Sequence, residues 1–253
     1  MNDKKLESYL SLSTQFYDAI RPNPPEESYN FYQCYVQNTH GFILEPMCGS
    51  GRFLLPLLQE GFNVQGFDAS THMLEALQAK ASLLHLKPKI WQDFAEDLNV
   101  PTKYNLIFIP SGSFGHIIEL EKVKRVLQLF YDHLNDDGIL VFEVESSKTV
   151  PQPLGVWRGS MCERQDGNKI LLSRLTTFKD NVCCSIDKYE LVHAHQIIQT
   201  EVEVFNVRVY DEPKILIDML KTISFKKIRA FKAFDVTALP NENDASIVLE
   251  CTK

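Results

Sequence analysis

Hydrophobic and polar positions alternate with two different periods along residues 1–150 of this 253-residue chain. Short apolar runs that end in polar or glycine-containing turns predict strands, and apolar residues three or four positions apart predict helices. The expected strands are 41–46, 63–70, 89–94, 104–113 and 139–145, and the expected helices are 52–60, 71–84 and 119–135. This alternation is typical of βαβ units, which build a parallel sheet with helices on both faces.

Local signals set the expected ends of these helices. Arg52 is expected to open the first helix, and the helix 71–84 is expected to bury Leu74, Leu77, Ala81 and Leu84 along one stripe. The sequence Asp136-Asp137-Gly138 is expected to end the helix 119–135 before the fifth strand begins.

The pattern changes after residue 150. Between 157 and 209, β-branched and aromatic residues alternate, with hairpin signals at Asp166-Gly167-Asn168 and Lys179-Asp180-Asn181. We therefore expect an antiparallel arm of three or four strands, then a helix after Asp211 and two strands, 226–234 and 245–252, that rejoin the main sheet. The predicted fold class is α/β, a Rossmann-like mixed seven-stranded sheet with helices on both faces and an antiparallel β arm inserted after the fifth strand.

No repeat, low-complexity tract or linker separates these patterns, so the chain is interpreted as one domain. It divides into N-terminal cap helices (1–40), a cofactor-binding core (41–150), the antiparallel β insertion (151–209) and a final helix with strands (210–253). Exposed strand edges of the arm invite pairing, so a homodimer through the arm is a further expectation.

Charge and cysteine usage narrow the partners. The formal net charge is −7 and no long basic run is present, which disfavours binding to long nucleic acids. A small-molecule or protein substrate is favoured. No stretch resembles a signal peptide or a membrane span, and the six cysteines show no metal-ligand spacing, so we expect a reduced, cytoplasmic protein.

The stretch Glu45-Pro46-Met47-Cys48-Gly49-Ser50-Gly51 follows the first predicted strand. Ligands of open parallel sheets bind beyond the carboxyl ends of the strands, and glycines allow the backbone to approach them closely. A dinucleotide fingerprint needs a third glycine where Leu54 stands, and Glu45 disfavours a pyrophosphate. S-adenosylmethionine (SAM) has no phosphate and carries an ammonium and a sulfonium, so a nearby carboxylate favours it. A nicotinamide-dependent oxidoreductase is the less favoured alternative.

This stretch resembles motif I of the class I SAM-dependent methyltransferases, with Met47 in place of the first glycine. Further motifs follow in the family's order over roughly residues 14 to 150, and the arm with the final strands is similar in layout to sugar N-methyltransferases. The resemblance implies a cofactor site made of Tyr17, Arg21, Glu45, Met47, Gly49, Gly51, Asp68, Ala69, Met73, Asp93, Phe94, Ser111 and Ser113.

The resemblance also implies roles within that site. Asp68 would bind the ribose hydroxyls, Met73 would cover the adenine, Asp93-Phe94 would contact its edge, and the loop Ser111–Phe114 would lie beneath the transferred methyl. Each residue has an ordinary alternative. Asp68 could serve merely as a helix cap, Met73 could be a core residue, and Asp93 could be a solvated charge in a loop. Arg21 could form an ion pair with Glu26 or Glu27.

The acceptor side offers three candidate catalytic residues, Glu143, Glu145 and His116. The two glutamates alternate with apolar residues, so both side chains should face the same side of the fifth strand and could hold an amine or accept its proton. A solvent-facing strand end and a helix-start histidine are the alternatives. His193 and His195 should share one strand face, but no third ligand accompanies them, so we expect no metal site.

The expected reaction is in-line transfer of a methyl group from SAM to N or O of a small-molecule acceptor, leaving S-adenosylhomocysteine. Because SAM is already activated, positioning and exclusion of water are the protein's main tasks. A non-catalytic SAM-binding regulatory subunit is the remaining alternative.

Overall fold

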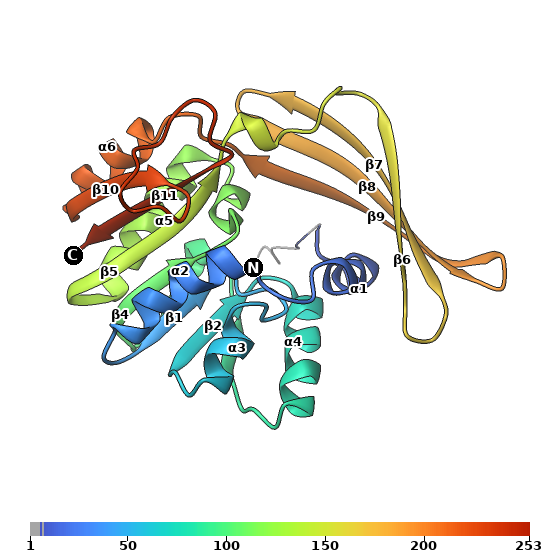
Figure 1. Ribbon diagram of the computed structural model, residues 1–253, viewed down its shortest axis with the longest axis horizontal. Coiled ribbons are helices and arrows are strands. Elements are labelled where there is room, and N and C mark those ends of the chain that lie inside the picture. The colour runs from blue at the N-terminus through green and yellow to red at the C-terminus, as the bar shows by residue number, and fades with distance from the viewer. Residues whose placement is uncertain (1–5, 7) are drawn as a thin grey trace.

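The computed structural model describes residue 6 and residues 8–253, and a mixed seven-stranded sheet forms its core (Figure 1). The strand order is β10-β11-β5-β4-β1-β2-β3. The strands are β1 (Ile43–Pro46), β2 (Val64–Asp68), β3 (Lys89–Gln92), β4 (Tyr104–Ile109), β5 (Leu134–Glu145), β10 (Lys226–Lys232) and β11 (Ser246–Thr252). Strand β11 runs antiparallel to both of its neighbours, and β1 to β5 pair in parallel. The predicted fold class is confirmed.

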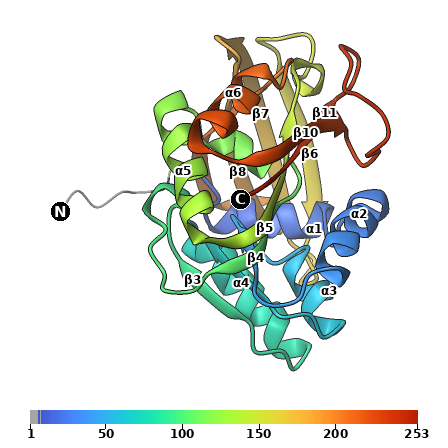
Figure 2. The ribbon, with the colours of Figure 1, turned by 90° about the vertical axis from the view of Figure 1, so that its left-hand side faces the viewer.

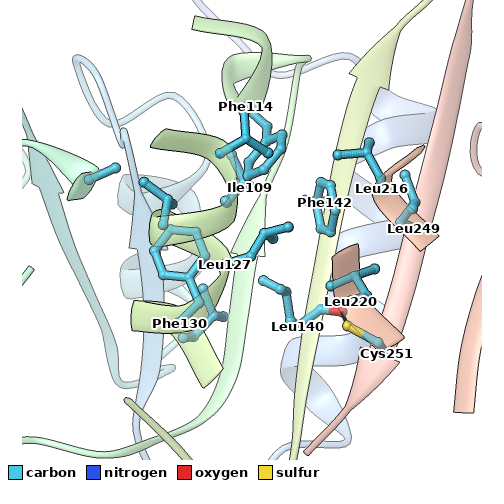
Figure 3. Packing of buried hydrophobic residues seen from close by; sticks show 14 of the residues in the cluster. Ile109, Phe114, Leu127, Phe130, Leu140, Phe142, Leu216, Leu220, Leu249 and Cys251 are labelled. Atoms are coloured by element: carbon cyan, nitrogen blue, oxygen red, sulfur yellow. Dashed lines mark hydrogen bonds between the residues drawn. The ribbon is translucent and has the colours of Figure 1, made fainter. Parts of the chain in front are cut away.

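Helices cover both faces of this sheet. One face packs against α2 (Glu26–Gln37), α3 (Leu54–Gln59) and α4 (Thr71–Leu83), and the other against α5 (Leu120–His133) and α6 (Lys214–Ile223). Neighbouring strand residues face opposite sides: Leu106 packs with the first set of helices and Ile107 with the second. Figure 3 shows the hydrophobic cluster on the second face, where side chains of β4, β5 and β11 meet those of α5 and α6. Burial on both faces explains the continuous apolar run from Leu106 to Ile109 in β4.

The arm is a separate four-stranded antiparallel sheet. Its strands are β6 (Trp157–Glu163), β7 (Lys169–Lys179), β8 (Val182–His193) and β9 (Gln196–Arg208), joined in chain order. Both predicted hairpins are present. The third turn lies at Ala194 and His195, whose φ angles are 46° and 69°; it gave no sequence signal because neither residue is a typical turn former.

The arm leaves the core after β5, returns before α6 and curves over α1 (Ser11–Ile20), as Figures 1 and 2 show. Leu12 and Phe16 of α1 pack against buried residues of the arm's inner face, which are Cys162, Ile170, Leu172, Tyr189 and Leu191. The outer face exposes apolar side chains, among them Trp157 and Val202. The homodimer through the arm stays a prediction.

Three predicted helix features were wrong. Helix α3 begins at Leu54, so Arg52 lies in the preceding turn. Strand β5 already begins at Leu134, and the register between β4 and β5 shifts beside Asp136-Asp137-Gly138, where Asp137 has a φ of 61°. The expected helix stop is therefore a bulge inside the strand. Leu84 is 41% exposed because α4 ends one residue before it.

The described residues also form three short 3-10 helices: η1 (Ala95–Asp97), η2 (Ser113–His116) and η3 (Ser147–Thr149). Among the residues that the structure describes, no helix combines the length and the apolar character needed to span a bilayer.

Candidate functional site

The glycine-rich turn after β1 is tied to the end of β2 by one carboxylate. Asp68 Oδ2 accepts the backbone N–H of Gly49 at 2.8 Å, and Oδ1 accepts that of Ser70 at 2.8 Å. Gly49 and Gly51 have φ angles of 53° and 81°. A Cβ on Gly51 would lie 2.8 Å from Leu77 Cγ, so this glycine is required by packing as well as by its conformation.

Met47 stands where the resemblance places the first glycine of motif I, and its backbone has a φ of 56°. That left-handed conformation costs a residue with a Cβ about 1–2 kcal/mol. The turn therefore keeps the shape that a glycine would favour, and Met47 adopts it under strain. Its side chain is partly buried against the core and lines the crevice above the turn.

This crevice contains two adjoining cavities. The turn cavity, of about 60 Å³, lies above the glycine-rich turn, and its lining includes Tyr17, Glu45, Met47, Gly49, Asp68, Met73, Ser111, Ser113 and His116. The edge cavity, of about 350 Å³, lies beside it toward β3, and its lining includes Met47, Asp68, Ala69, Asp93, Phe94 and His116. Most of the predicted cofactor residues are thus brought together, on the carboxyl side of β1 to β4.

Asp68 and Asp93 stand at the ends of neighbouring strands. Strands β2 and β3 pair in parallel through Asp68 and Gln92, and the backbone N–H of Asp93 donates to Asp68 O at 3.1 Å. The backbone N–H of Phe94 donates to Asp93 Oδ1 at 2.9 Å. The edge cavity is therefore lined by two carboxylates that can accept hydrogen bonds and that lie at the ends of adjacent strands.

Glu45 is 2% exposed, and burial raises its pKa well above the usual value, although Arg52 opposes that rise. Within the described part of the chain, Glu45 Oε2 and Arg52 Nε are buried atoms without a hydrogen-bond partner. An unpaired buried acceptor costs free energy, so this pair of orphaned atoms fits a ligand that carries both a cationic and an anionic group.

Arg52 also reaches the loop after β4, where its Nη2 donates to Ser111 Oγ. The backbone N–H of Ser111 donates to Glu143 Oε2 at 2.9 Å. Ser111 and Gly112 have φ angles of 61° and 68°, so two left-handed residues form this loop. Burial raises the pKa of Glu143, and the hydrogen bonds to this carboxylate partly offset that rise.

Glu143 and Glu145 do face the same side, as the alternation predicted. Both line an open cavity of about 520 Å³, the acid cavity, together with Arg21, Arg52 and Ser111. It shares Arg52 and Ser111 with the turn cavity. Arg21 does not line the turn cavity; its guanidinium lies 5.8 Å from the ring centroid of Tyr17.

Sequence reasoning missed several residues of the site: Arg52 was expected only to open a helix, and Asp18 and Tyr9 were not among the predicted site residues. Asp18 of α1 accepts hydrogen bonds from Ser50 Oγ and from Lys80 Nζ, the latter at 2.9 Å, and so fastens α1 to the turn and to α4. Tyr9 precedes α1 and lines both the turn and the edge cavities. Tyr9 lies upstream of the motifs that carry the family resemblance, so no spacing pointed to it.

Tyr9 is hydrogen-bonded to His116, with Tyr9 Oη and His116 Nε2 3.3 Å apart. His116 Nδ1 lies 3.1 Å from the carbonyl oxygen of Asn206. Because a carbonyl oxygen only accepts, Nδ1 carries the proton and Nε2 accepts from the tyrosine. Burial lowers the pKa of His116, which keeps the imidazole neutral.

The expectation that His193 and His195 share one strand face was wrong. His195 lies in the turn between β8 and β9, and His193 Nδ1 is 2.6 Å from Asn168 Oδ1. Among residue 6 and residues 8–253, no group of three or more His, Cys, Asp or Glu side chains is placed to hold a metal ion.

Comparison with known proteins agrees with this site. A family model described as a methyltransferase domain matches residues 43–138. A protein of Geobacillus sp. (strain WCH70) that bears the name of a methyltransferase is 29% identical over 140 residues, which are 52% of this chain and 56% of that one. The chain thus spans about half the length of the relatives that it matches in sequence.

Solved structures are similar over nearly the whole chain. A SAM-dependent methyltransferase from Clostridium acetobutylicum ATCC 824 has a TM-score of 0.77 and 19% identity, over 95% of this chain and 97% of that one. The sugar N-methyltransferase KedS8 from Streptoalloteichus sp ATCC 53650 has a TM-score of 0.74 and 15% identity, over 98% and 96%. At these identities the likeness shows the fold.

Residues 43–138 are thus a methyltransferase domain, the chain has the fold of SAM-dependent methyltransferases, and SAM is the cofactor of this domain. The residues present fit this cofactor. The orphaned Glu45 and Arg52 atoms suit the ammonium and carboxylate of a methionine moiety, and the bare Cα of Gly49 leaves room above the turn. The family, the enzyme class and the cofactor expected from the sequence are confirmed.

Proposed function

We propose that the protein transfers the methyl group of SAM to an amine nitrogen of a small molecule. The observation that carries this proposal is a further cavity that shares two walls with the turn cavity. This arm cavity, of about 200 Å³, lies between α1 and the inner face of the arm and is lined by Tyr9 and Tyr17, which also line the turn cavity. A molecule bound there would contact the same tyrosines as the methionine moiety of SAM.

The lining of the arm cavity favours a small, polar, amine-bearing acceptor. Five aromatic rings surround it, and faces of such rings attract cations. They belong to Tyr9, Phe16, Tyr17, Tyr189 and Phe205. The guanidiniums of Arg21 and Arg174 also line the cavity and disfavour a protonated amine, so the acceptor nitrogen would bind in its neutral, nucleophilic form. Arg174 has a fixed orientation, because its guanidinium donates two hydrogen bonds to the buried Asp187. KedS8, a neighbour of similar fold, is named as a sugar N-methyltransferase, which is the kind of acceptor that we propose here.

SAM, when bound, supplies a methyl group that is already activated by its sulfonium. The residues of this chain then bind, orient and exclude water. Asp68 and Asp93 would accept hydrogen bonds from the ribose and the adenine, and Glu45 would balance the ammonium. The neutral Nε2 of His116 could accept the proton that an amine must lose, and Glu143 and Glu145 are further proton acceptors beside the loop after β4.

Two measurements test this proposal. Titration calorimetry with SAM, S-adenosylhomocysteine and NAD should show binding of the first two, and preferential binding of NAD would overturn it. Labelled SAM should then methylate members of a panel of amino sugars and other small amines, but not their hydroxyl analogues. SAM binding without turnover on any amine of a broad panel would favour the regulatory alternative. Turnover of hydroxyl acceptors alone would contradict transfer to nitrogen.

A further inference from the structure

Helix α1 has no N-terminal cap of its own. Its N-cap residue, Leu10, offers no side-chain acceptor, yet the first backbone N–H groups of a helix need partners. Two carboxylates of arm strand β9 bind backbone N–H groups at this end, Glu201 within the first turn of the helix and Glu203 just before it. Glu203 accepts the N–H groups of Tyr9 and Leu10 at 2.8 and 2.9 Å, and Glu201 accepts that of Leu12 at 2.7 Å. Anions are favoured at a helix N-terminus, so the arm caps α1 from across the fold.

Glu203 is suited to this contact because it is 3% exposed and uses both carboxylate oxygens, one for each N–H group. The two groups belong to consecutive residues, so the carboxylate fixes the orientation of the peptide between them. Tyr9 lies 194 positions before Glu203 in the chain. Its φ of 55° is a strained conformation that persists only where the surroundings hold it.

The backbone of Tyr9 continues this contact into the cofactor site. Its carbonyl oxygen accepts Ser70 Oγ at 2.7 Å, and the backbone N–H of Ser70 donates to Asp68 Oδ1 at 2.8 Å. A continuous series of hydrogen bonds therefore runs from Glu203 on the arm, through Tyr9 and Ser70, to Asp68 at the end of β2.

The side chain of Tyr9 lies where the three cavities meet, since it lines the turn, edge and arm cavities. Its ring makes edge-to-face contacts with His116 and Phe205, at centroid distances of 5.7 and 5.3 Å. A shift of Tyr9 would therefore change the shape of the cofactor site and of the acceptor cavity together.

We propose that Glu203 is a positioning residue for methyl transfer. By binding the N–H groups of Tyr9 and Leu10, it holds the Tyr9 ring in the wall shared by the cofactor and the acceptor. This inference rests on the proposed function. It gives the arm a part in building the cofactor site, although the arm supplies no motif of the family.

The test is a double-mutant cycle on SAM affinity, measured by titration calorimetry on the full chain. Glu203→Gln should raise the Kd for SAM about tenfold, because one N–H group loses a charged acceptor. In the Tyr9→Ala background the same substitution should change the Kd less than twofold, because Glu203 acts through Tyr9. Equal effects of Glu203→Gln in the two backgrounds would overturn the proposal.

Glu201→Gln is the matched control. It removes a carboxylate from the same helix end, but its partner is Leu12 and not Tyr9. Thermal unfolding measures the loss of stability in each glutamine variant, and Glu201→Gln should leave the Kd for SAM within twofold. An increase in Kd as large as that of Glu203→Gln would show that helix capping alone matters, which contradicts positioning.

Glu203→Asp tests the same contact with the charge kept and serves if Glu203→Gln does not fold. Its side chain is one methylene shorter, so it should lose the hydrogen bond to one of the two N–H groups of Tyr9 and Leu10. This variant should also raise the Kd for SAM, and an unchanged Kd would count against the proposal. Failure of the unsubstituted protein to bind SAM would instead overturn the proposed function, and this inference with it.

Discussion

Asp68 accepts the backbone N–H of Gly49 at 2.8 Å, so the acid at the end of β2 holds the glycine-rich turn that follows β1. The same carboxylate is expected to bind the ribose of SAM. One side chain would therefore both shape the turn and bind the ligand, and substitutions at Asp68 should affect stability as well as affinity.

Asp68→Asn tests this double role. An amide keeps one acceptor oxygen, but it presents N–H groups to one of the two backbone donors, Gly49 or Ser70. We expect SAM affinity to fall by about 1.5–3 kcal/mol, the range for losing a hydrogen bond to a charged group, and the melting temperature to fall as well. Calorimetry and thermal unfolding of the unliganded protein measure the two effects. Asp68 would have no place in the site if the folded variant bound SAM normally.

The left-handed backbone of Met47 gives a second prediction. Met47→Ala and Met47→Gly remove the same side-chain contacts, but only glycine adopts the φ of 56° without a Cβ clash. The glycine variant should therefore be more stable than the alanine variant by about 1 kcal/mol, measured by urea unfolding.

Ala79, an exposed position in helix α4, provides the control for Met47. There the order should reverse, because glycine in a helix costs about 1 kcal/mol relative to alanine. If alanine were the more stable residue at both positions, the turn would not require a left-handed residue at 47.

Gly51 and Gly61 separate backbone strain from crowding. Both have positive φ angles, 81° and 89°, but a Cβ would meet Leu77 Cγ at 2.8 Å on Gly51 and nothing within 4 Å on Gly61. Gly61→Ala should cost about 1–2 kcal/mol of stability from strain alone. Gly51→Ala should cost about 1–3 kcal/mol more from overpacking, and urea unfolding of both variants gives the comparison. Equal losses would show that the turn can move away from α4.

The fold was predictable because its signals are local. Strand residues such as Leu106 and Ile107 pack on opposite faces of a covered sheet, so the strand that contains them is a continuous apolar run. The turns after β1 and β2 contain glycine or serine, which are typical turn residues. The start of β5 was not predictable, because Asp136-Asp137-Gly138 has the composition of a turn whether it ends a helix or forms a bulge.

The position of the candidate cofactor site was predictable for the same reason, since Glu45 and Asp68 lie at the carboxyl ends of β1 and β2 and Asp93 follows β3. Tyr9 could not be found in this way. Its place in the site depends on α1 folding over the crevice and on Glu203 of the arm, two segments far apart in the chain. A tertiary contact of this kind leaves no periodicity or spacing in the sequence.

Glu45→Gln should stabilise the unliganded protein while weakening SAM binding. The carboxylate is 2% exposed with one oxygen unpaired within the described residues, so ionising it in the apo protein is costly, and an amide of the same shape avoids this cost.

Burial raises the folded-state pKa of Glu45 above its ordinary value of 4.5, so the native state binds more protons than the unfolded state. Stability from this group is therefore fully present below pH 4.5 and is lost as pH rises through the folded pKa. Relative to Glu45→Gln, the unsubstituted protein should become less stable between pH 5 and pH 8, by about 1–3 kcal/mol in urea unfolding. With saturating SAM the order of stability should reverse, because only the carboxylate balances the ammonium of the cofactor. A glutamine variant that loses stability at both pH values and binds SAM as well as the unsubstituted protein would mean that Glu45 serves the turn and not the ligand.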